Sequence, residues 1–527
     1  MDLKTRKYDR QLRLWAANGQ AALEQAKVCL VNGTATGTET LKNLILPGIG
    51  SFTVLDDQTV TEADLGNNFF FDTESLGTPR AKAAVDLLRE LNAEVGSQTV
   101  VESPTRTIDD NPSFFHKFNL IITTNLSEDY ERKLSKICWE SDIPIIFIRS
   151  IGYLGYFRVQ MPEVTLVETH PDSLIDFRLD RPFPQLLEYA SQFDFETSDS
   201  MEHGNIPFVV ILLRYMDLWK KSHGGGIPKT YAEKQEFKKL IRSGVRFQEE
   251  ENFEEAESNV MKACTLTKIP REIEQIFQDE KCQNVTSESP NFWLICRAVR
   301  DFIEEEGNGL LPLSGTLPDM KSDTKGYVQL QNVYRQKAQQ DIAAVRAHLE
   351  NVLRHLELPP DSVPHVELES FCKHAAYIKV IRYRTLDEEI ETNVKADYIS
   401  QHLQDEEGLL PYYVLIRGAD QFQRTEARWP GTGNTWENDA PVLCQRATEV
   451  LTRMGVKEAS AIVGTERFQN LALEICRYGE CELHNTAGLL GGLVAQEAIK
   501  LVTKQYIPVN NTVIFDGTRA MSASFEL

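Results

Sequence analysis

The side chains most able to do chemistry lie in a turn between two apolar segments near the start of the chain. Residues 28–31 are apolar and β-branched, which is typical of a buried strand, and small residues follow over 32–37. Gly33 and Gly37 are the two glycines of this turn. Because glycine lets backbone N–H groups approach a phosphate, the turn indicates a nucleotide-type anion site.

The other residues of the turn weaken this interpretation. Asn32 and residues 34–36 carry side chains that would obstruct the close approach of a phosphate. From spacing alone, binding of a nucleotide and loss of that binding both remain open.

The elements around the turn have the order of a nucleotide-binding unit. We expect a helix over 38–46, which Gly48 and Gly50 end, and a second strand over 52–55 that leads to Asp56. Strand, glycine turn, helix, strand and acid is the order found in βαβ nucleotide-binding units.

Composition excludes several classes of partner. The 527-residue chain suits two to four domains, and its formal net charge of −22 argues against a nucleic acid or an anionic membrane as the main partner. The nine cysteines contain no CxxC pair, so a zinc site has no support and no metal is expected. No apolar run is long enough to span a membrane. We expect a soluble, reduced protein of the cytoplasm, with the nucleus as a further location.

A short amphipathic helix is predicted before the first strand. It places three apolar side chains on one face and three arginines on the other: Tyr8, Leu12 and Trp15 against Arg6, Arg10 and Arg13. A solvated arginine face is one interpretation. Arginine also suits a phosphate, because its charge is fixed and its donors are forked.

Several blocks together resemble the adenylation domain of ubiquitin-like activating enzymes. They are the Tyr-Asp-Arg-Gln of 8–11, the Leu-Pro-Gly-Ile-Gly of 46–50, and residues 491–500 and 515–517 near the end. The resemblance implies an α/β fold of the ThiF-like (Rossmann-like) adenylation type, degenerate and interrupted by a large, mostly helical insertion. The expected domains are 1–165 for the first part of the adenylation fold, 166–480 for an insertion that resembles a catalytic-cysteine domain without the cysteine, and 481–527 for the return segment.

Compared with the family's catalytic members, the chain lacks charged groups of the nucleotide site. Asp56 retains the first acid, but the second acid falls on Gln58, an arginine on Asn67 and a lysine on Arg80. Adenylation needs magnesium and fixed cations to neutralise the charge that builds up. The resemblance therefore implies no catalytic residue and no cofactor bound by this chain alone, with ATP and magnesium in a partner's site.

Arg10 is the exception that the resemblance suggests. In the family, the arginine of this helix reaches across the dimer to the nucleotide of the partner. Arg10 is therefore a candidate contact to ATP in trans, and local pairing of Arg10 is the alternative.

The insertion shows no candidate for a thioester nucleophile. Its cysteines lie in amphipathic helical contexts, where buried structural thiols are expected: Cys264, Cys282, Cys296, Cys372 and Cys444.

One segment of the insertion, residues 317–341, resembles the regulatory subunits of neddylation-activating enzymes, a branch of the same family. In that branch the segment helps to bind the catalytic partner. The candidate interface residues are Met320, Tyr327, Leu330, Gln331, Val333 and Tyr334. An internal cap on the helical block is the alternative.

The resemblance extends from Tyr8 to the end of the chain. It implies a regulatory subunit that pairs with a catalytic subunit to activate the ubiquitin-like modifier of neddylation. The partner would adenylate the modifier with ATP and capture it as a thioester on its own cysteine, upstream of cullin modification.

Three alternatives remain. The first is a non-catalytic subunit for a different ubiquitin-like modifier. The second is a nicotinamide-dependent dehydrogenase, because Asp56 lies about twenty residues beyond the turn, although Asn32 and Thr34 argue against it. The third is a self-sufficient activating enzyme, which would need the site and the cysteine that the sequence does not show.

Overall fold

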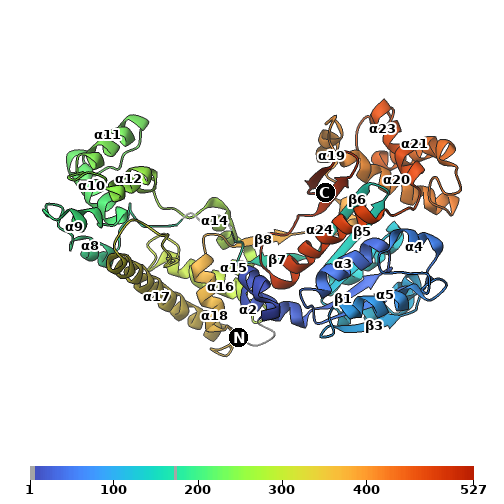
Figure 1. The fold of residues 1–527 in the computed structure, drawn as a ribbon, viewed down its shortest axis with the longest axis horizontal. Helices are drawn as coiled ribbons and strands as arrows, with labels where there is room; N and C mark the ends of the chain where they lie inside the picture. Colours follow the sequence, from blue (N-terminus) through green and yellow to red (C-terminus); the bar gives the residue numbers. More distant parts are fainter. Residues whose placement is uncertain (1–5, 171–174) are drawn as a thin grey trace. The chain divides into compact units, whose positions relative to one another are not determined.

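The computed structural model describes residues 6–170 and 175–527, and its chain divides into two compact units. The first unit joins the residues up to 164 with 380–527, and the second holds 165–379. The first unit contains the predicted α/β domain and is described first (Figure 1).

An eight-stranded sheet forms the centre of the first unit, in the order β10-β9-β6-β5-β4-β1-β2-β3. The strands are β1 (Lys27–Val31), β2 (Ser51–Leu55), β3 (Gly96–Val100), β4 (Leu120–Thr124), β5 (Ile145–Ile151), β6 (Leu154–Gln160), β9 (Thr512–Asp516) and β10 (Met521–Phe525). Strands β3, β2, β1, β4 and β5 are parallel, whereas β6, β9 and β10 pair antiparallel. The strands expected at 28–31 and 52–55 are confirmed.

Helices cover both faces of this sheet. The helices of the first unit are α2 (Asp9–Gln25), α3 (Ala35–Ile45), α4 (Glu62–Asn67), α5 (Arg80–Leu88), η1 (Arg89–Leu91), α6 (Pro104–Asp110), η2 (Pro112–Lys117), α7 (Glu128–Glu140), η3 (Glu388–Thr392), α19 (Ala396–Leu403), α20 (Leu410–Glu426), α21 (Trp436–Arg453), α22 (Ala459–Val463), α23 (Glu466–Tyr478) and α24 (His484–Thr503). Figure 1 shows α24 beside α3 on one face.

The close contact of α24 with α3 depends on a glycine. A Cβ added to Gly491 would lie 2.9 Å from the backbone nitrogen of Thr40. Such a distance is too short for any side chain, so Gly491 permits the two helices to approach this closely. The contact attaches the return segment of the chain to its first part.

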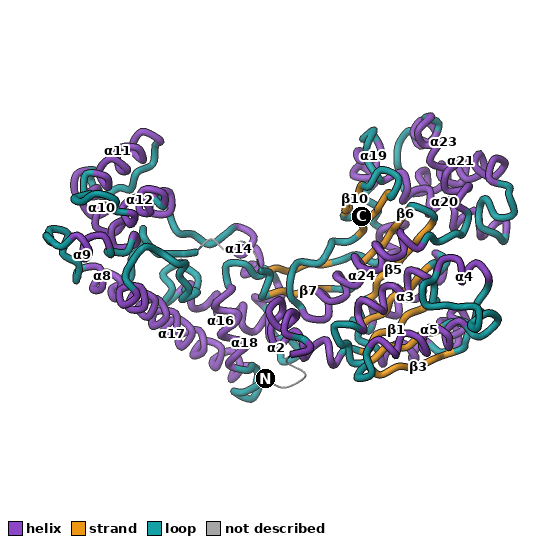
Figure 2. Tube along the Cα trace, in the orientation of Figure 1, coloured by secondary structure: helices purple, strands orange, loops and turns teal. Residues whose placement is uncertain are grey.

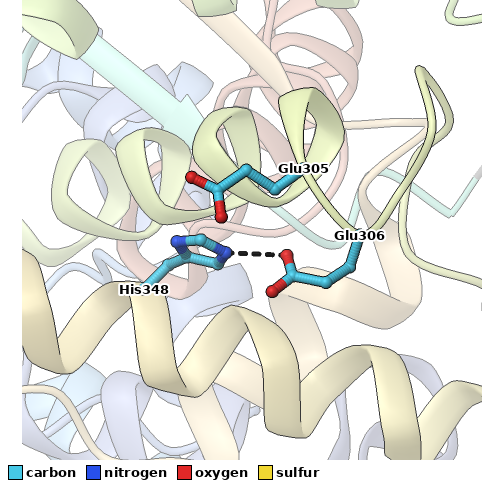
Figure 3. Close-up of side chains that lie close together, drawn as sticks. All are labelled: Glu305, Glu306 and His348. Atoms are coloured by element: carbon cyan, nitrogen blue, oxygen red, sulfur yellow. Dashed lines mark hydrogen bonds and ion pairs between the residues drawn. The ribbon is translucent and has the colours of Figure 1, made fainter.

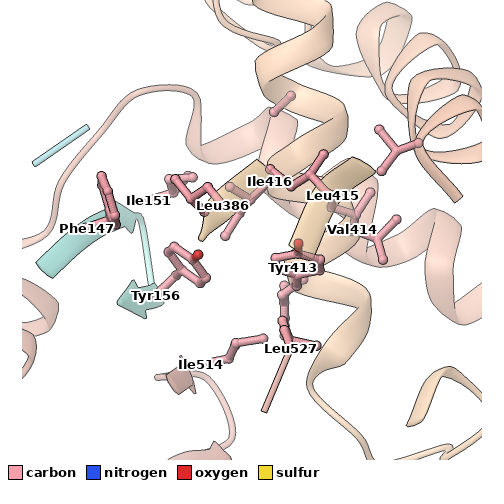
Figure 4. Packing of buried hydrophobic residues seen from close by; sticks show 14 of the residues in the cluster. Phe147, Ile151, Tyr156, Leu386, Tyr413, Val414, Leu415, Ile416, Ile514 and Leu527 are labelled. Atoms are coloured by element: carbon pink, nitrogen blue, oxygen red, sulfur yellow. The ribbon is translucent and has the colours of Figure 1, made fainter. Parts of the chain in front are cut away.

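A continuous apolar core fills the opposite face. It combines strand residues such as Phe147 and Tyr156 with Leu415 of α20, Ile514 of β9 and the terminal Leu527 (Figure 4). Buried residues of α19, α21, α22 and α23 belong to the same core.

This core explains why the domain boundaries differ from the expected ones. The expected insertion runs over 166–480, but the structure places 380–480 in the first unit, because these helices share a core with the sheet. The sequence pattern had shown only that this stretch is helical.

The second unit is mostly helical, as Figure 2 shows. Its helices are α8 (Pro184–Ala190), α9 (Ser200–Gly204), α10 (Phe208–Ser222), α11 (Tyr231–Arg242), α12 (Glu251–Ser258), α13 (Val260–Ala263), α14 (Arg271–Gln278), α15 (Glu280–Gln283), α16 (Asn291–Glu304), α17 (Thr324–His355) and α18 (His365–His374). A short sheet of β7 (Glu163–Leu166) and β8 (Lys379–Arg382) forms where the chain passes between the units. None of the helices in residues 6–170 and 175–527 combines the length and the hydropathy that a membrane span requires.

Candidate functional site

The predicted nucleotide turn lies at the end of β1 and is fixed to the neighbouring strands. Asn32 has a φ of +68°, and its Nδ2 donates to the carbonyl oxygen of Thr124 at 2.8 Å. The hydroxyl of Thr124 donates back to the carbonyl oxygen of Asn32 at 2.7 Å. The Gly33 N–H donates to Asp56 Oδ2 at 2.7 Å. The turn is therefore held by protein groups on both sides.

A carboxylate of this chain occupies the N-terminus of α3. Glu482 is 5% exposed, and its carboxylate accepts from Ala35 N at 2.8 Å, Thr36 Oγ1 at 2.8 Å and Thr34 Oγ1 at 3.1 Å. We call Thr34, Ala35 and Thr36 the cradle. Burial raises the pKa of Glu482, while hydrogen bonds from the cradle oppose that rise. The position where a phosphate would meet a helix N-terminus is thus filled.

The helix also begins earlier than expected. The sequence predicts it over 38–46, but α3 starts at Ala35, and Thr34 is its N-cap. The local pattern does not reveal Glu482, which satisfies the first N–H of the helix. Gly37 lies inside α3, where an added Cβ would be 2.9 Å from Leu30 Cδ1. Gly37 therefore serves the packing of the helix on β1.

Asp56 and Arg80 neutralise each other beside the turn. The Arg80 Nε donates to Asp56 Oδ2 at 2.6 Å, and its Nη1 lies 3.4 Å from Asp64 Oδ1. Burial acts to lower the pKa of Arg80, but the charges of Asp56 and Asp64 outweigh it and raise the pKa. The Gln58 N–H donates to Asp56 Oδ1 at 2.8 Å. Both carboxylate oxygens of Asp56, which is 0% exposed, therefore already accept hydrogen bonds from protein groups.

A cavity of about 600 Å³, which we call the cleft, opens above these groups. Its lining includes the predicted Asn32, Gln58, Asn67 and Arg80, together with Arg149, Trp429 and Glu482. Arg149 is buried and pairs with Glu131 at 3.1 Å and with Asp420 at 3.1 Å. Both arginines of the cleft are thus paired inside the protein.

Sequence reasoning missed Arg149, Trp429 and Glu482. Glu482 is 447 residues from Ala35 along the chain, so no local spacing could connect them. The only signal for its position was the resemblance of 491–500 to the return segment of the adenylation fold.

Arg10 has a different environment, on the first part of α2. Its side chain is exposed, and no hydrogen bond or ion pair joins it to another described residue. The adjacent Arg13 pairs with Asp9 at 2.8 Å. Tyr8 anchors this end of the helix: it is 3% exposed, and its hydroxyl lies 3.2 Å from Asn92 Nδ2 and 3.3 Å from Glu94 Oε2.

The predicted interface residues of the insertion fall into two groups. Leu330 and Tyr334 are fully buried in the core of the second unit, and the Tyr334 hydroxyl donates to the carbonyl oxygen of Phe177 at 2.7 Å. Their side chains therefore belong to internal packing, as the alternative interpretation expected. Met320, Tyr327, Gln331 and Val333 are partly exposed, and contact with a partner stays a prediction for them.

Burial disfavours the thiolate form of three cysteines in the helical region. Burial raises the pKa of Cys282 and Cys372 to about 12 and that of Cys264 to about 11. Cys296 is buried and Cys444 is partly exposed. A thiol with such a raised pKa carries little thiolate at neutral pH.

One group of side chains in the second unit could hold a metal ion. Glu305, Glu306 and His348 bring one ligand atom each within 4.8 Å of one another (Figure 3). Both glutamates are exposed, and His348 Nε2 is 2.8 Å from Glu306 Oε2. The hydrogen bond between His348 and Glu306 already accounts for the geometry of these two residues.

The chain is similar to proteins of one family along its length. The ThiF family model matches residues 8–527. A NEDD8-activating enzyme E1 regulatory subunit of Gallus gallus is 43% identical, over 100% of this chain and 98% of its own length. The Xenopus laevis protein of that name is 42% identical over 100% and 99%, and the AXL protein of Arabidopsis thaliana, named as the same subunit, is 40% identical over 99% and 99%. These relatives do not favour a dehydrogenase or a subunit for another modifier.

Proposed function

The chain belongs to the ThiF family and, within it, to the NEDD8-activating enzyme E1 regulatory subunits, and we propose that it completes the nucleotide site of a catalytic partner in trans. In this proposal, the partner binds ATP and magnesium, adenylates the ubiquitin-like modifier and captures it as a thioester on its own cysteine. This chain contributes Arg10 and part of the interface.

The occupied cradle and the paired charges at the edge of the cleft are the observations that carry the proposal. The N-terminus of α3, where a phosphate would bind, is occupied by the carboxylate of Glu482. Arg80, the arginine beside the turn, is paired with Asp56. Gln58 and Asn67 are neutral, so they cannot supply the charges of a metal ligand or a phosphate clamp. The residues present therefore do not fit a nucleotide with its magnesium, and this chain alone is expected to bind neither.

Arg10 supports the second half of the proposal. It is a permanent cation with forked donors, which suits it to a phosphate, and it stands exposed on a helix that Tyr8 anchors. Charge-assisted hydrogen bonds from an arginine to a nucleotide stabilise the transferring phosphoryl group in other phosphoryl-transfer enzymes.

The test is ATP–pyrophosphate exchange driven by the ubiquitin-like modifier. Three preparations are compared: this chain, the catalytic partner, and both together. We expect ATP–pyrophosphate exchange only when this chain and the catalytic partner are present together. Exchange by this chain alone would overturn the proposal, because the cleft would then be a working site.

We also propose that the partly exposed residues of 317–341 contact the catalytic partner. A separate proposal is that the protein acts in the cytoplasm and nucleus. All nine cysteines are free, which fits a reducing compartment. Subcellular fractionation with disulfide-sensitive labelling tests the location. The contact is tested by combining Tyr327→Ala with Gln331→Ala and measuring the Kd of the complex with the catalytic partner.

A further inference from the structure

The contact between Glu482 and the cradle has the composition of an anion site with its ligand in place. The N-terminus of an eleven-residue helix supplies the Ala35 N–H, and two threonine hydroxyls converge on the same carboxylate. Backbone N–H groups at a helix N-terminus, with hydroxyl donors beside them, are also what binds phosphate in nucleotide-binding folds.

We propose that Glu482 is a built-in substitute for phosphate, which closes this chain's own cleft to inorganic phosphate, pyrophosphate and nucleotides. The cradle retains its affinity for anions, and an intramolecular carboxylate uses that affinity. The proposal deepens the proposed function and rests on it in one respect, that nucleotide chemistry belongs to the partner.

The character of the three contacts supports this assignment. Each partner of the Glu482 carboxylate within the cradle is a donor, and these donors favour the ionised form, against the burial that raises the pKa of Glu482. The helix dipole adds attraction for a negative group at this end. A phosphate would be attracted by the same features.

The backbone of the return segment holds Glu482 in place. The Gly152 N–H donates to the carbonyl oxygen of Cys481 at 2.7 Å, and Gly152 forms a parallel bridge with Glu482. An incoming phosphate therefore competes with a carboxylate that is already positioned at high effective concentration. Displacement would also leave a buried carboxylate without its donors.

The experiment measures anion binding to the full-length chain without the partner, so its outcome does not depend on ATP–pyrophosphate exchange. Inorganic pyrophosphate is titrated calorimetrically into the wild type, Glu482→Ala and Glu482→Gln, at constant ionic strength set with chloride. Glu480→Gln is the matched control, because Glu480 lines the same cleft and is exposed.

We expect Glu482→Ala to bind pyrophosphate at least about tenfold more tightly than the wild type, because the cradle donors are then free. Glu482→Gln should show a smaller gain, and Glu480→Gln none. Circular dichroism checks the fold, and if Glu482→Ala does not fold, Glu482→Gln decides. Equal affinities of a folded Glu482 variant and the wild type overturn the proposal, whether both bind or neither does. A gain in Glu480→Gln as large as that in the Glu482 variants overturns it as well.

Discussion

The cleft and the first turns of α2 differ in whether their charged side chains are paired within the protein. In the cleft, Arg80 and Asp56 neutralise each other and Glu482 is taken by the cradle. On α2, the Arg10 side chain is exposed and forms no hydrogen bond or ion pair with another described residue. Both regions belong to the same unit, yet the charged groups of the cleft pair with groups of this chain, whereas the charge of Arg10 faces solvent. The proposed function rests on this difference, because the charges of the cleft are paired within the chain and the charge of Arg10 is not.

The largest effect on stability is expected from a variant that breaks the Arg80–Asp56 ion pair of the cleft. Arg80→Leu leaves Asp56 buried without its cation, and we expect a loss of about 3–5 kcal/mol in the free energy of unfolding. Urea denaturation of the full-length chain measures it. Arg106→Leu is the control, because its pair with Asp110 is 82% and 67% exposed and should cost under about 0.5 kcal/mol. Similar losses in the two variants would mean that the cleft is not a structural region.

The next effect concerns the free arginine. Arg10→Ala should weaken ATP binding by the assembled complex about 10- to 100-fold, since a hydrogen bond to a charged group contributes about 1.5–3 kcal/mol. The unfolding free energy of the chain alone should not change. Fluorescence titration with an ATP analogue measures the Kd, and Arg13→Ala is the control, because Arg13 already pairs with Asp9. An unchanged Kd in Arg10→Ala would reduce α2 to a scaffold.

A smaller effect tests whether the cradle and Glu482 act together. Thr36→Val removes one of the three donors of the cradle and should cost about 1–2 kcal/mol in the free energy of unfolding. A double-mutant cycle with Glu482→Gln should give a coupling energy of about 1 kcal/mol. Additive losses would show that the hydroxyl and the carboxylate do not cooperate.

The smallest effect tests the anchor of α2. Tyr8→Phe removes the hydroxyl contacts to Asn92 and Glu94 and should cost about 1 kcal/mol in the free energy of unfolding. ATP affinity of the complex should change by less than a factor of three or so, because the ring that packs the helix remains. A loss of ATP affinity as large as that in Arg10→Ala would mean that the hydroxyl positions Arg10.

The sequence predicted elements that depend on local pattern. The apolar strands at 28–31 and 52–55 have clear patterns, but β3 (Gly96–Val100) has mostly exposed, polar residues and no such signal. The buried face of α17 was also readable, because Leu330 and Tyr334 stand four residues apart at helical spacing. The prediction that Leu330 and Tyr334 lie at an interface was wrong, because this apolar stripe packs in the core of the second unit.

The candidate site depended on contacts that no local pattern carries. Asp56 could be placed near the turn from the order of elements, and Gln58 and Arg80 from the resemblance to the adenylation domain. That Arg80 would pair with Asp56, and that Glu482 would occupy the cradle, follows from the closure of the fold. Spacing in the sequence gives no information on such pairs.

The long separation between the cradle and Glu482 also bears on how the protein is made. A ribosome adding about 5–20 residues per second needs roughly 20 to 90 s to pass from Ala35 to Glu482, which lie 447 residues apart. During synthesis the cradle has emerged without its carboxylate, and α3 lacks the helix that covers it. The nascent chain therefore exposes the donors of the cradle and the face of α3 that α24 later covers until its last segment has been made.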